Sequence, residues 1–345
     1  MKVFWRWFAI FINTTCLAAL CLSYLAPFID PRTSTIAAFF GLSYPFWLIA
    51  TLLSTLFALI YKMGVFKYNV VVLALGIPFL IRYISFHNPE PRSEHSFRIA
   101  AFNTNGFGAQ FGKNNLPNIR TFLDSSNTDF AVLIEFRNQN EGVLKAKLPN
   151  YHTFHGRNKK VGIHVATRFE VVNRGQVYIG EQTYGMITFT DIVIHASDTI
   201  RIYGVHLESN KLKPRDYYQL RDLRLDSSYQ EHALSIRKRI QQSMQQRAMQ
   251  VNALQYHMKD CRYRSIICGD FNDTPHSFTY QELKYGKKDA FIEKGSGWES
   301  SFLKPFPLLR IDYLLYDPEL KCTNYQSTDD IFSDHKLIFA DLELK

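Results

Sequence analysis

The sequence predicts an α+β fold in which two packed β-sheets are flanked by helices, preceded by an N-terminal region of transmembrane helices. Two observations carry this prediction. Charged residues are sparse in residues 1–96 and ordinarily frequent in residues 97–345, which separates a membrane-embedded front from a globular part. The globular part alternates many short β-type runs with a few helical ones, and this mixture favours packed sheets covered by helices.

The composition excludes some classes of protein and leaves others open. Hydrophobic residues at 46% exclude a disordered chain, and charged residues at 21% exclude a pure membrane bundle. The net charge of +9 divides into +4 in residues 1–96 and +5 in residues 97–345. The mild excess of +5 does not by itself indicate a nucleic-acid binder, although it is compatible with phosphate-bearing substrates and anionic membrane surfaces. The five cysteines are too few and too irregularly spaced for a disulfide framework or a zinc site.

Residues 1–86 are predicted to form a transmembrane region of about three helices. The segments 7–28 and 36–61 carry no charge and exceed the roughly 20 residues that cross a bilayer. A cleaved signal peptide is the alternative for the first segment, but its length and the second long segment argue against cleavage. The third segment, 65–86, spans only if the cations near its ends reach outward to the interfaces. An interfacial or re-entrant hairpin is the alternative for it.

The distribution of charge around these segments predicts their orientation. Basic residues without acidic neighbours flank one side, at Lys2, Arg6, Lys62 and Lys67. On the other side, Arg32, Arg82 and Arg92 are offset by Asp30, Glu90 and Glu94. The positive-inside bias therefore places the N-terminus in the cytoplasm, and three crossings export residues 97–345. We expect a multi-pass protein of the plasma (inner) membrane, with 87–96 as the linker because it holds two prolines and no periodicity.

The predicted elements of the globular part are short. Strand-like runs rich in β-branched and aromatic residues occupy 97–102, 129–135, 161–167, 186–194, 200–206, 265–268, 311–316 and 337–342. Helical patterns occupy 116–123, 236–258 and 277–283.

Most of the strand-like runs end in a polar residue that is suited to phosphate or metal chemistry. These residues are Asn103, Glu135, His206, Asp270 with Asn272, Asp312, and Asp334 with His335. One polar residue at the end of a strand is not informative. Six of them in one domain indicate strands whose ends bring polar side chains together at the same edge of the fold.

These residue types point to metal-assisted phosphoryl chemistry. Carboxylates and asparagine carbonyls are hard oxygen ligands, which suit Mg²⁺ or Mn²⁺ rather than Zn²⁺. In an extended segment, Asp270 and Asn272 lie on the same side, where one can orient water while the other donates to a phosphate oxygen. A histidine beside a carboxylate, such as His335, has a fixed tautomer and can carry a proton. A turn after a strand is the structural alternative for Asp270 and Asn272, and a turn is the preferred interpretation of Asn105 and Gly106.

Six motifs occur together in a defined order. They are FNTN (102–105), the strand end at Glu135, HLES (206–209), GDFN (269–272), RIDY (310–313) and SDH (333–335). The set resembles the endonuclease/exonuclease/phosphatase superfamily, which includes deoxyribonuclease-like nucleases, neutral sphingomyelinases and inositol-polyphosphate 5-phosphatases. The resemblance covers about residues 97–345 and implies a four-layer α/β/β/α sandwich.

The resemblance also implies a role for each site residue. Glu135 is the principal ligand of a divalent metal, Mg²⁺ or Mn²⁺, with Asn103 as a second ligand and Asp334 supporting the site. Asp270 orients or deprotonates the attacking water, and Asn272 and His206 contact the phosphate. His335, oriented by Asp312, serves as base or charge stabiliser. Ile134 departs from the family pattern, in which glutamine often precedes the metal-binding glutamate.

An extra polar stretch at 209–235 separates His206 from the predicted helix at 236–258. Its basic residues, Lys211, Lys213, Arg215, Arg221 and Arg224, could form a flap that faces substrate or lipid. A solvated insertion is the preferred interpretation, because charge runs usually face water.

Together these observations predict a membrane-anchored, divalent-metal-dependent phosphoesterase. Its expected partners are the lipid bilayer and a phosphoester substrate, either nucleic acid or a phospholipid headgroup, and no protein partner is inferred. The alternative is a catalytically silent membrane-bound scaffold that uses the same fold to bind a partner.

Overall fold

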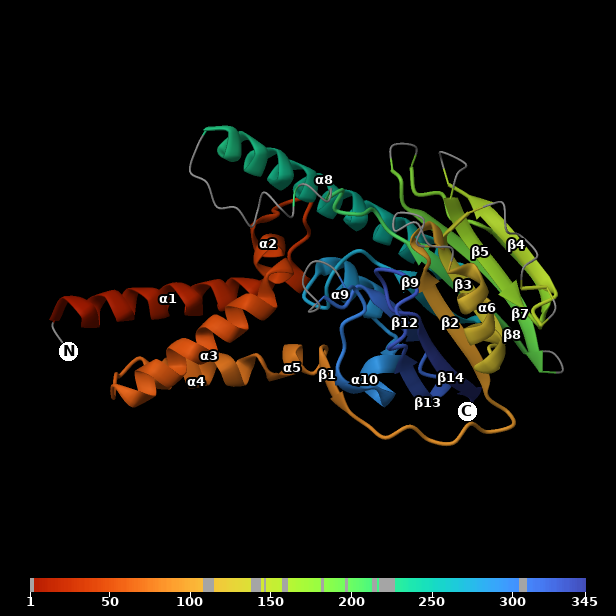
Figure 1. Cartoon of the computed structure of the whole chain (residues 1–345), viewed down its shortest axis with the longest axis horizontal. Helices are drawn as coiled ribbons and strands as arrows, with labels where there is room; N and C mark the ends of the chain where they lie inside the picture. The colour runs from red at the N-terminus through yellow and green to blue at the C-terminus, as the bar shows by residue number, and fades with distance from the viewer. Residues whose placement is uncertain are drawn as a thin grey trace.

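The computed structural model describes residues 3–107, 115–137, 144–145, 147–156, 161–180, 183–195, 198–212, 216, 227–303 and 309–345. A helical region formed by the first part of the chain projects from one side of a two-sheet sandwich (Figure 1). The predicted α+β class with two mixed, packed sheets is confirmed.

Each of the two sandwich sheets has six strands among the described residues. The first has the order β13 (Leu320–Ser327), β14 (Ile338–Leu344), β2 (Phe97–Asn103), β3 (Phe130–Arg137), β5 (Val161–Thr167) and β4 (Asn150–His155). The second has the order β10 (Lys288–Asp289), β12 (Asp312–Tyr316), β9 (Arg264–Asp270), β8 (Asp198–His206), β7 (Met186–His195) and β6 (Glu170–Gln176).

The layers are held together by three apolar clusters. Between the sheets, Ile99 and Val132 of the first pack with Ile202 of the second. The outer face of the first sheet is covered by α6 (Leu116–Ser125), and the outer face of the second by α8 (Ser227–Lys259) and α9 (Phe278–Lys284). This is the expected four-layer α/β/β/α sandwich. The helix predicted at 236–258 is present and begins earlier, at Ser227.

The register of the central strands brings the polar strand ends to one edge. Strands β2 and β3 are parallel, with Asn103 opposite Ile134, and β8 and β9 are parallel, with His206 opposite Asp270. Strand β12 is antiparallel to β9 and begins at this edge, with Asp312 opposite Asp270. Because parallel strands end together, motifs far apart in the sequence meet there.

The helical region consists of α1 (Val3–Leu25), the 3₁₀ turn η1 (Ala26–Phe28), α2 (Ile36–Leu42), α3 (Tyr44–Ile60), α4 (Phe66–Leu75) and α5 (Ile77–Leu80). By length and composition, the helix through Phe28 is the one continuous segment among the described residues that could cross a membrane. The pair α2 and α3 also qualifies if a bent pair counts as one span.

Two predicted helices of this region are wrong in extent. The segment 36–61 is not one helix, because it breaks at Ser43 and the two halves are bent by 73°. Pro45 lies at the start of α3, where it has no N–H to continue the preceding helix. The segment 65–86 is interrupted at Gly76 and ends its helical course at Leu80.

The chain then enters the sandwich instead of continuing as a helix. Residues Ile84–Phe86 form β1, which pairs with β11 (Ser296–Trp298) beside α10 (Ala290–Lys294). The expected linker at 87–96 follows the sandwich surface: the Glu90 amide donates to Thr323 O, and the Ser93 hydroxyl donates to Glu343. The helical region is therefore joined to the sandwich by paired backbone as well as by a connecting segment.

Candidate active site

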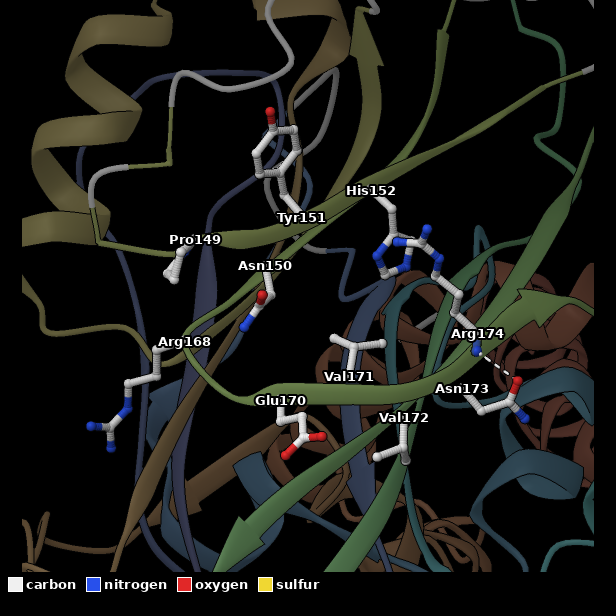
Figure 2. Close-up of a pocket in the computed structure, with 10 residues that line it drawn as sticks. All are labelled: Pro149, Asn150, Tyr151, His152, Arg168, Glu170, Val171, Val172, Asn173 and Arg174. Atoms are coloured by element: carbon white, nitrogen blue, oxygen red, sulfur yellow. Dashed lines mark hydrogen bonds between the residues drawn. The ribbon is translucent and has the colours of Figure 1, made fainter.

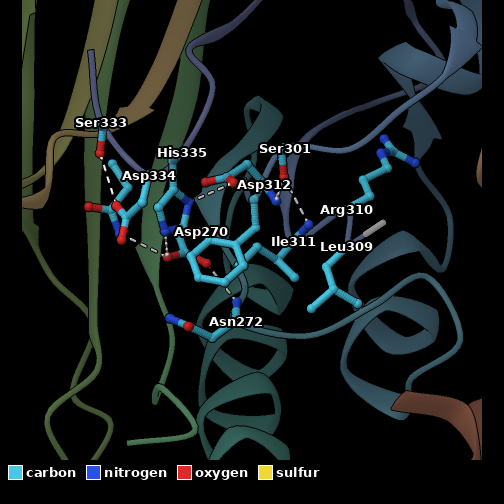
Figure 3. A network of polar contacts seen from close by, with 12 residues as sticks. Asp270, Asn272, Ser301, Leu309, Arg310, Ile311, Asp312, Ser333, Asp334 and His335 are labelled. Atoms are coloured by element: carbon cyan, nitrogen blue, oxygen red, sulfur yellow. Dashed lines mark hydrogen bonds and ion pairs between the residues drawn. The ribbon is translucent and has the colours of Figure 1, made fainter. Parts of the chain in front are cut away.

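All eight side chains expected in the site lie at the edge where β2, β3, β8 and β9 end. The set comprises Asn103, Glu135, His206, Asp270, Asn272, Asp312, Asp334 and His335. Figure 3 shows the part of the set that comprises Asp270, Asn272, Asp312, Asp334 and His335. The structure thus brings together residues that are up to 232 positions apart in the sequence.

Glu135 owes its position to an irregularity in β3. The β3–β5 register shifts between Leu133 and Phe136, and Glu135 has a φ of +53°. Such a conformation is costly for a residue with a side chain, and strain of this kind concentrates at functional sites. Thr104 stabilises the bulge by donating its hydroxyl to Ile134 O and Glu135 O. The side chain of Glu135 remains 32% exposed.

Asn103 connects two of the carboxylates. Its Nδ2 donates to Asp270 Oδ2 over 2.9 Å and lies 3.4 Å from Glu135 Oε1. Its Oδ1 accepts the backbone N–H of Asn105. His206 Nε2 lies 3.6 Å from the same oxygen, Glu135 Oε1.

A buried ion pair lies behind Asp270. His335 Nδ1 and Asp312 Oδ2 are 2.9 Å apart, and His335 Nε2 is 3.8 Å from Asp270 Oδ2. Burial lowers the pKa of His335, but Asp312 and Asp270 outweigh it and raise that pKa to about 10. Burial raises the pKa of Asp312 to about 6, against the attraction of His335. An imidazolium therefore faces a carboxylate at neutral pH.

The GDFN motif combines a glycine with a strained asparagine. Gly269 has a φ of +133°, and a Cβ there would lie 2.2 Å from Val205 O, so the close pairing of β8 and β9 requires glycine. Asn272 has a φ of +52°, donates its N–H to Asp270 Oδ1 and donates Nδ2 to Leu207 O. One of its two amide hydrogens is engaged in this way, which leaves the second available for a substrate oxygen.

Two contributing residues were not expected from the sequence. Asn105 does lie in a turn, as predicted, but its Nδ2 also donates to Asp334 Oδ1 over 2.8 Å and links the FNTN and SDH motifs. Ser301 Oγ accepts the backbone N–H groups of Ile311 and Asp312, both over 2.9 Å (Figure 3). No spacing marks Ser301 in the sequence, whereas Asn105 stands inside a recognised motif.

The donor set fits a divalent cation. Four carboxylates, Glu135, Asp270, Asp312 and Asp334, lie at this edge, and the His335 imidazolium faces two of them, so the site carries an excess of negative charge. Ligand atoms of Asp270, Asp312 and His335 lie within 4.8 Å of one another. Hard oxygen donors of this kind favour Mg²⁺ or Mn²⁺. Glu135 has a partly exposed carboxylate, whereas Asn103 is buried with its Oδ1 accepting the Asn105 N–H, and Asp312 is paired with His335.

Two other features contain none of the eight candidate site residues. A polar groove of about 800 Å³ runs between the edge strands β4 and β6 and is lined by His152, Arg168 and Arg174 among others (Figure 2).

The extra polar stretch at 209–235 is described only in part. Lys211 forms an ion pair with Glu208 over 2.7 Å, whereas Lys213, Arg215, Arg221 and Arg224 lie outside the described residues.

Comparison with known proteins agrees with this geometry. Residues 100–335 match the Endonuclease/Exonuclease/phosphatase family. The chain belongs to the endonuclease/exonuclease/phosphatase family. Members of this family hydrolyse phosphoester bonds and depend on a divalent metal ion, so this chain is a metal-dependent phosphoester hydrolase.

Residues 5–83, which include most of the helical region, match a domain of unknown function, DUF8431. No curated protein matches the chain.

Solved structures of the family share the fold at low sequence identity. A Bacteroides vulgatus endonuclease/exonuclease/phosphatase is 16% identical, with a TM-score of 0.56 over 72% of this chain and 99% of that one. A mannosyl-6-phosphatase from Bacteroides thetaiotaomicron is 16% identical, with a TM-score of 0.52 over 71% and 99%. D. rerio TDP2, complexed with a single-strand DNA product, is 14% identical, with a TM-score of 0.53 over 72% and 100%.

Proposed function

We propose that this chain is a membrane-anchored phosphoesterase that uses Mg²⁺ or Mn²⁺ to hydrolyse a phosphodiester or phosphomonoester by attack of water. The observation that carries the proposal is the convergence of Glu135, Asn103 and Asp270 with the buried Asp312–His335 pair at one edge of the sandwich. A protein that only binds a partner would not require the buried Asp312–His335 pair next to Glu135 and Asn272, which are strained and partly exposed.

The proposed roles follow from the contacts. Glu135 and Asn103 hold the metal ion, and Asp334 adds negative charge nearby. When bound, the metal ion supplies Lewis-acid stabilisation of charge on the phosphoryl oxygens. Asp270 orients the attacking water. The His335 imidazolium lies 3.8 Å from Asp270 and already carries its proton, so Asp270 is the group that takes a proton from the water, while His335 stabilises the negative charge beside it.

Two further side chains have free donors at the open side of the site. Asn272 retains one amide hydrogen, and the side chain of His206 is 20% exposed beside Glu135. Both are suited to phosphate oxygens, the former in substrate binding and the latter also near the leaving group. The residues that reach solvent are therefore those that would meet substrate, while Asp270 and Asp312 are buried behind them.

Several features support the membrane anchor. Most of the exposed large apolar side chains among the described residues lie in residues 3–86, as expected for a surface that contacts lipid. Lys62 and Lys67 flank the connection from α3 to α4, at the end of the helical region that points away from the sandwich (Figure 1). The positive-inside bias then supports a multi-pass plasma (inner) membrane protein whose sandwich is extracytoplasmic.

The position of the site favours a phospholipid headgroup as substrate. The loop after Asn272 contacts the helical region, where Arg82 donates to Pro275 O over 2.9 Å, so the site lies near the end of the proposed anchor. The family relatives described above carry names that refer to a sugar phosphate and to single-strand DNA, so nucleic acid is the second candidate substrate.

The test uses the full chain in phospholipid nanodiscs with Mg²⁺. Hydrolysis of bis-p-nitrophenyl phosphate, single-strand DNA and the nanodisc phospholipid is measured with and without EDTA. We expect turnover that EDTA and His335→Ala abolish, while His155→Ala, an exposed histidine on β4, retains it. Hydrolysis of DNA alone would overturn the lipid assignment, and no turnover of any phosphoester would favour the scaffold.

A further inference from the structure

The end of the helical region makes polar contacts directly behind the active site. These contacts centre on Arg82, which follows α5 and precedes β1. Its guanidinium and its carbonyl bind two different segments of the sandwich, and each segment carries residues of the site.

The Arg82 side chain holds the segment that follows GDFN. Its Nη1 donates to Pro275 O over 2.9 Å, and its Nη2 donates to Gln281 Oε1 over 2.9 Å. The guanidinium also lies over the ring of Tyr280, 5.5 Å from its centre. Pro275 is three residues beyond Asn272, so this contact restrains the chain that positions the Asp270–Asn272 pair.

The Arg82 carbonyl holds the segment that precedes Asp312. It accepts a hydrogen bond from Nη1 of Arg310 over 3.0 Å. Arg310 is completely buried, and its Nη2 forms an ion pair with Asp289 over 2.6 Å. The Tyr313 hydroxyl lies 2.8 Å from both Arg310 O and Asp273 O, so the two segments held by Arg82 are also tied to each other.

Packing around His276 strengthens the same junction. The imidazole is fully buried and stacks on Tyr44, with ring centres 3.5 Å apart, and Phe79 and Tyr83 lie within 6 Å of it. All three rings come from the helical region. A Cβ at Gly41 would lie 2.3 Å from His276 O, so helix α2 meets this segment at backbone distance.

We propose that Arg82 is a positioning residue of the active site, through which the helical region holds Asp270, Asn272 and Asp312 in place. The inference rests on the proposed function, because it concerns the same site. It makes the helical region a supporting part of the catalytic unit in addition to an anchor. Arg247 of α8 also holds this segment, through Asp273 Oδ2 at 3.0 Å, so loss of Arg82 loosens the segment without releasing it.

Arg92 provides a matched control. It also lies in the N-terminal part of the chain and binds the sandwich through one carbonyl and one side chain, Asn127 O at 2.9 Å and the carboxylate of Asp129. Asp129 immediately precedes β3, at the end of that strand opposite Glu135. Arg92→Ala therefore removes a similar pair of contacts between the N-terminal part of the chain and the sandwich. It changes no contact at the edge that carries the candidate site.

The experiment compares full-length Arg82→Ala, Arg82→Lys and Arg92→Ala in nanodiscs with bis-p-nitrophenyl phosphate. We expect Arg82→Ala to lower kcat by roughly tenfold to a hundredfold with a smaller change in KM, since misplacement of the reacting groups by about 1 Å can cost up to about a hundredfold. Arg82→Lys keeps the positive charge and one donor nitrogen and should recover part of kcat, and Arg92→Ala should stay within about twofold of wild type. Hydrogen–deuterium exchange of the backbone amides in residues 269–281 should be faster than in wild type in Arg82→Ala, and unchanged in Arg92→Ala.

Two results would overturn the inference: an unchanged kcat in Arg82→Ala, or an equal loss in Arg92→Ala, which would mark a purely structural anchor. If the wild-type chain hydrolyses no phosphoester, the proposed function fails instead. The exchange measurement then decides by itself whether Arg82 holds the 269–281 segment.

Discussion

The Asp312→Asn variant tests the buried ion pair with little change of shape. Asp312 is 1% exposed, and its Oδ2 lies 2.9 Å from Nδ1 of His335. Asparagine keeps the volume and one oxygen acceptor but loses the negative charge that faces the imidazolium. Removing one partner of a buried pair costs about 3–5 kcal/mol, and the retained acceptor favours the lower end of this range. If about 3 kcal/mol is lost from transition-state stabilisation, kcat/KM falls by roughly a hundredfold.

The assay is hydrolysis of bis-p-nitrophenyl phosphate by the full chain in nanodiscs, normalised to the folded fraction. Asp191→Asn is the control, because Asp191 is equally buried in the same sheet and pairs with Arg201 over 2.6 Å, away from the site edge. We expect both variants to lose stability but only Asp312→Asn to lose turnover. A kcat/KM of Asp312→Asn within threefold of wild type would refute this role of the pair.

Three further predictions concern backbone geometry, protonation and metal binding. Gly269→Ala should destabilise the chain by about 3 kcal/mol, from a positive φ and a Cβ 2.2 Å from Val205 O, and an unchanged midpoint of urea unfolding would contradict it. Burial lowers the pKa of His164 to about 3, so the unfolded chain binds its proton first on acidification. Stability is then lost as the pH falls below about 6.5, by about 1.4 kcal/mol per unit, and His164→Gln should flatten this slope in urea titrations between pH 7 and pH 5. Glu135→Gln should weaken Mn²⁺ binding by about tenfold or more in calorimetry, since the ligand loses its charge, and unchanged affinity would remove Glu135 from the proposed ligands.

The convergence of the candidate site residues can be predicted from the sequence because these residues end strands. Asn103, His206 and Asp270 each follow an apolar run that is long enough to identify a strand, and parallel pairing then brings the ends together. Strands β4, β6 and β13 were not predicted. Their sequences mix exposed and polar residues, as in NYHTFH and EVVNRGQ for the two edge strands, so no alternation marks them.

Other features depend on tertiary contacts that no local pattern contains. Ser301 contributes only because β12 starts beside it, and Arg82 reaches Pro275 only because the third apolar segment ends early. That early end has a local cause in Gly76 and Pro78, which interrupt the helical course, but the pairing of β1 with β11 requires the folded sandwich.

The location of a bound divalent ion tests the central claim most directly. Crystals of the full chain grown with Mn²⁺ would give an anomalous difference map in which the ion is identified by its own scattering. The account predicts one strong peak within coordination distance of Glu135 and Asn103, lost in Glu135→Gln. A peak away from Glu135, or none at the edge where β2, β3, β8 and β9 end, would contradict it.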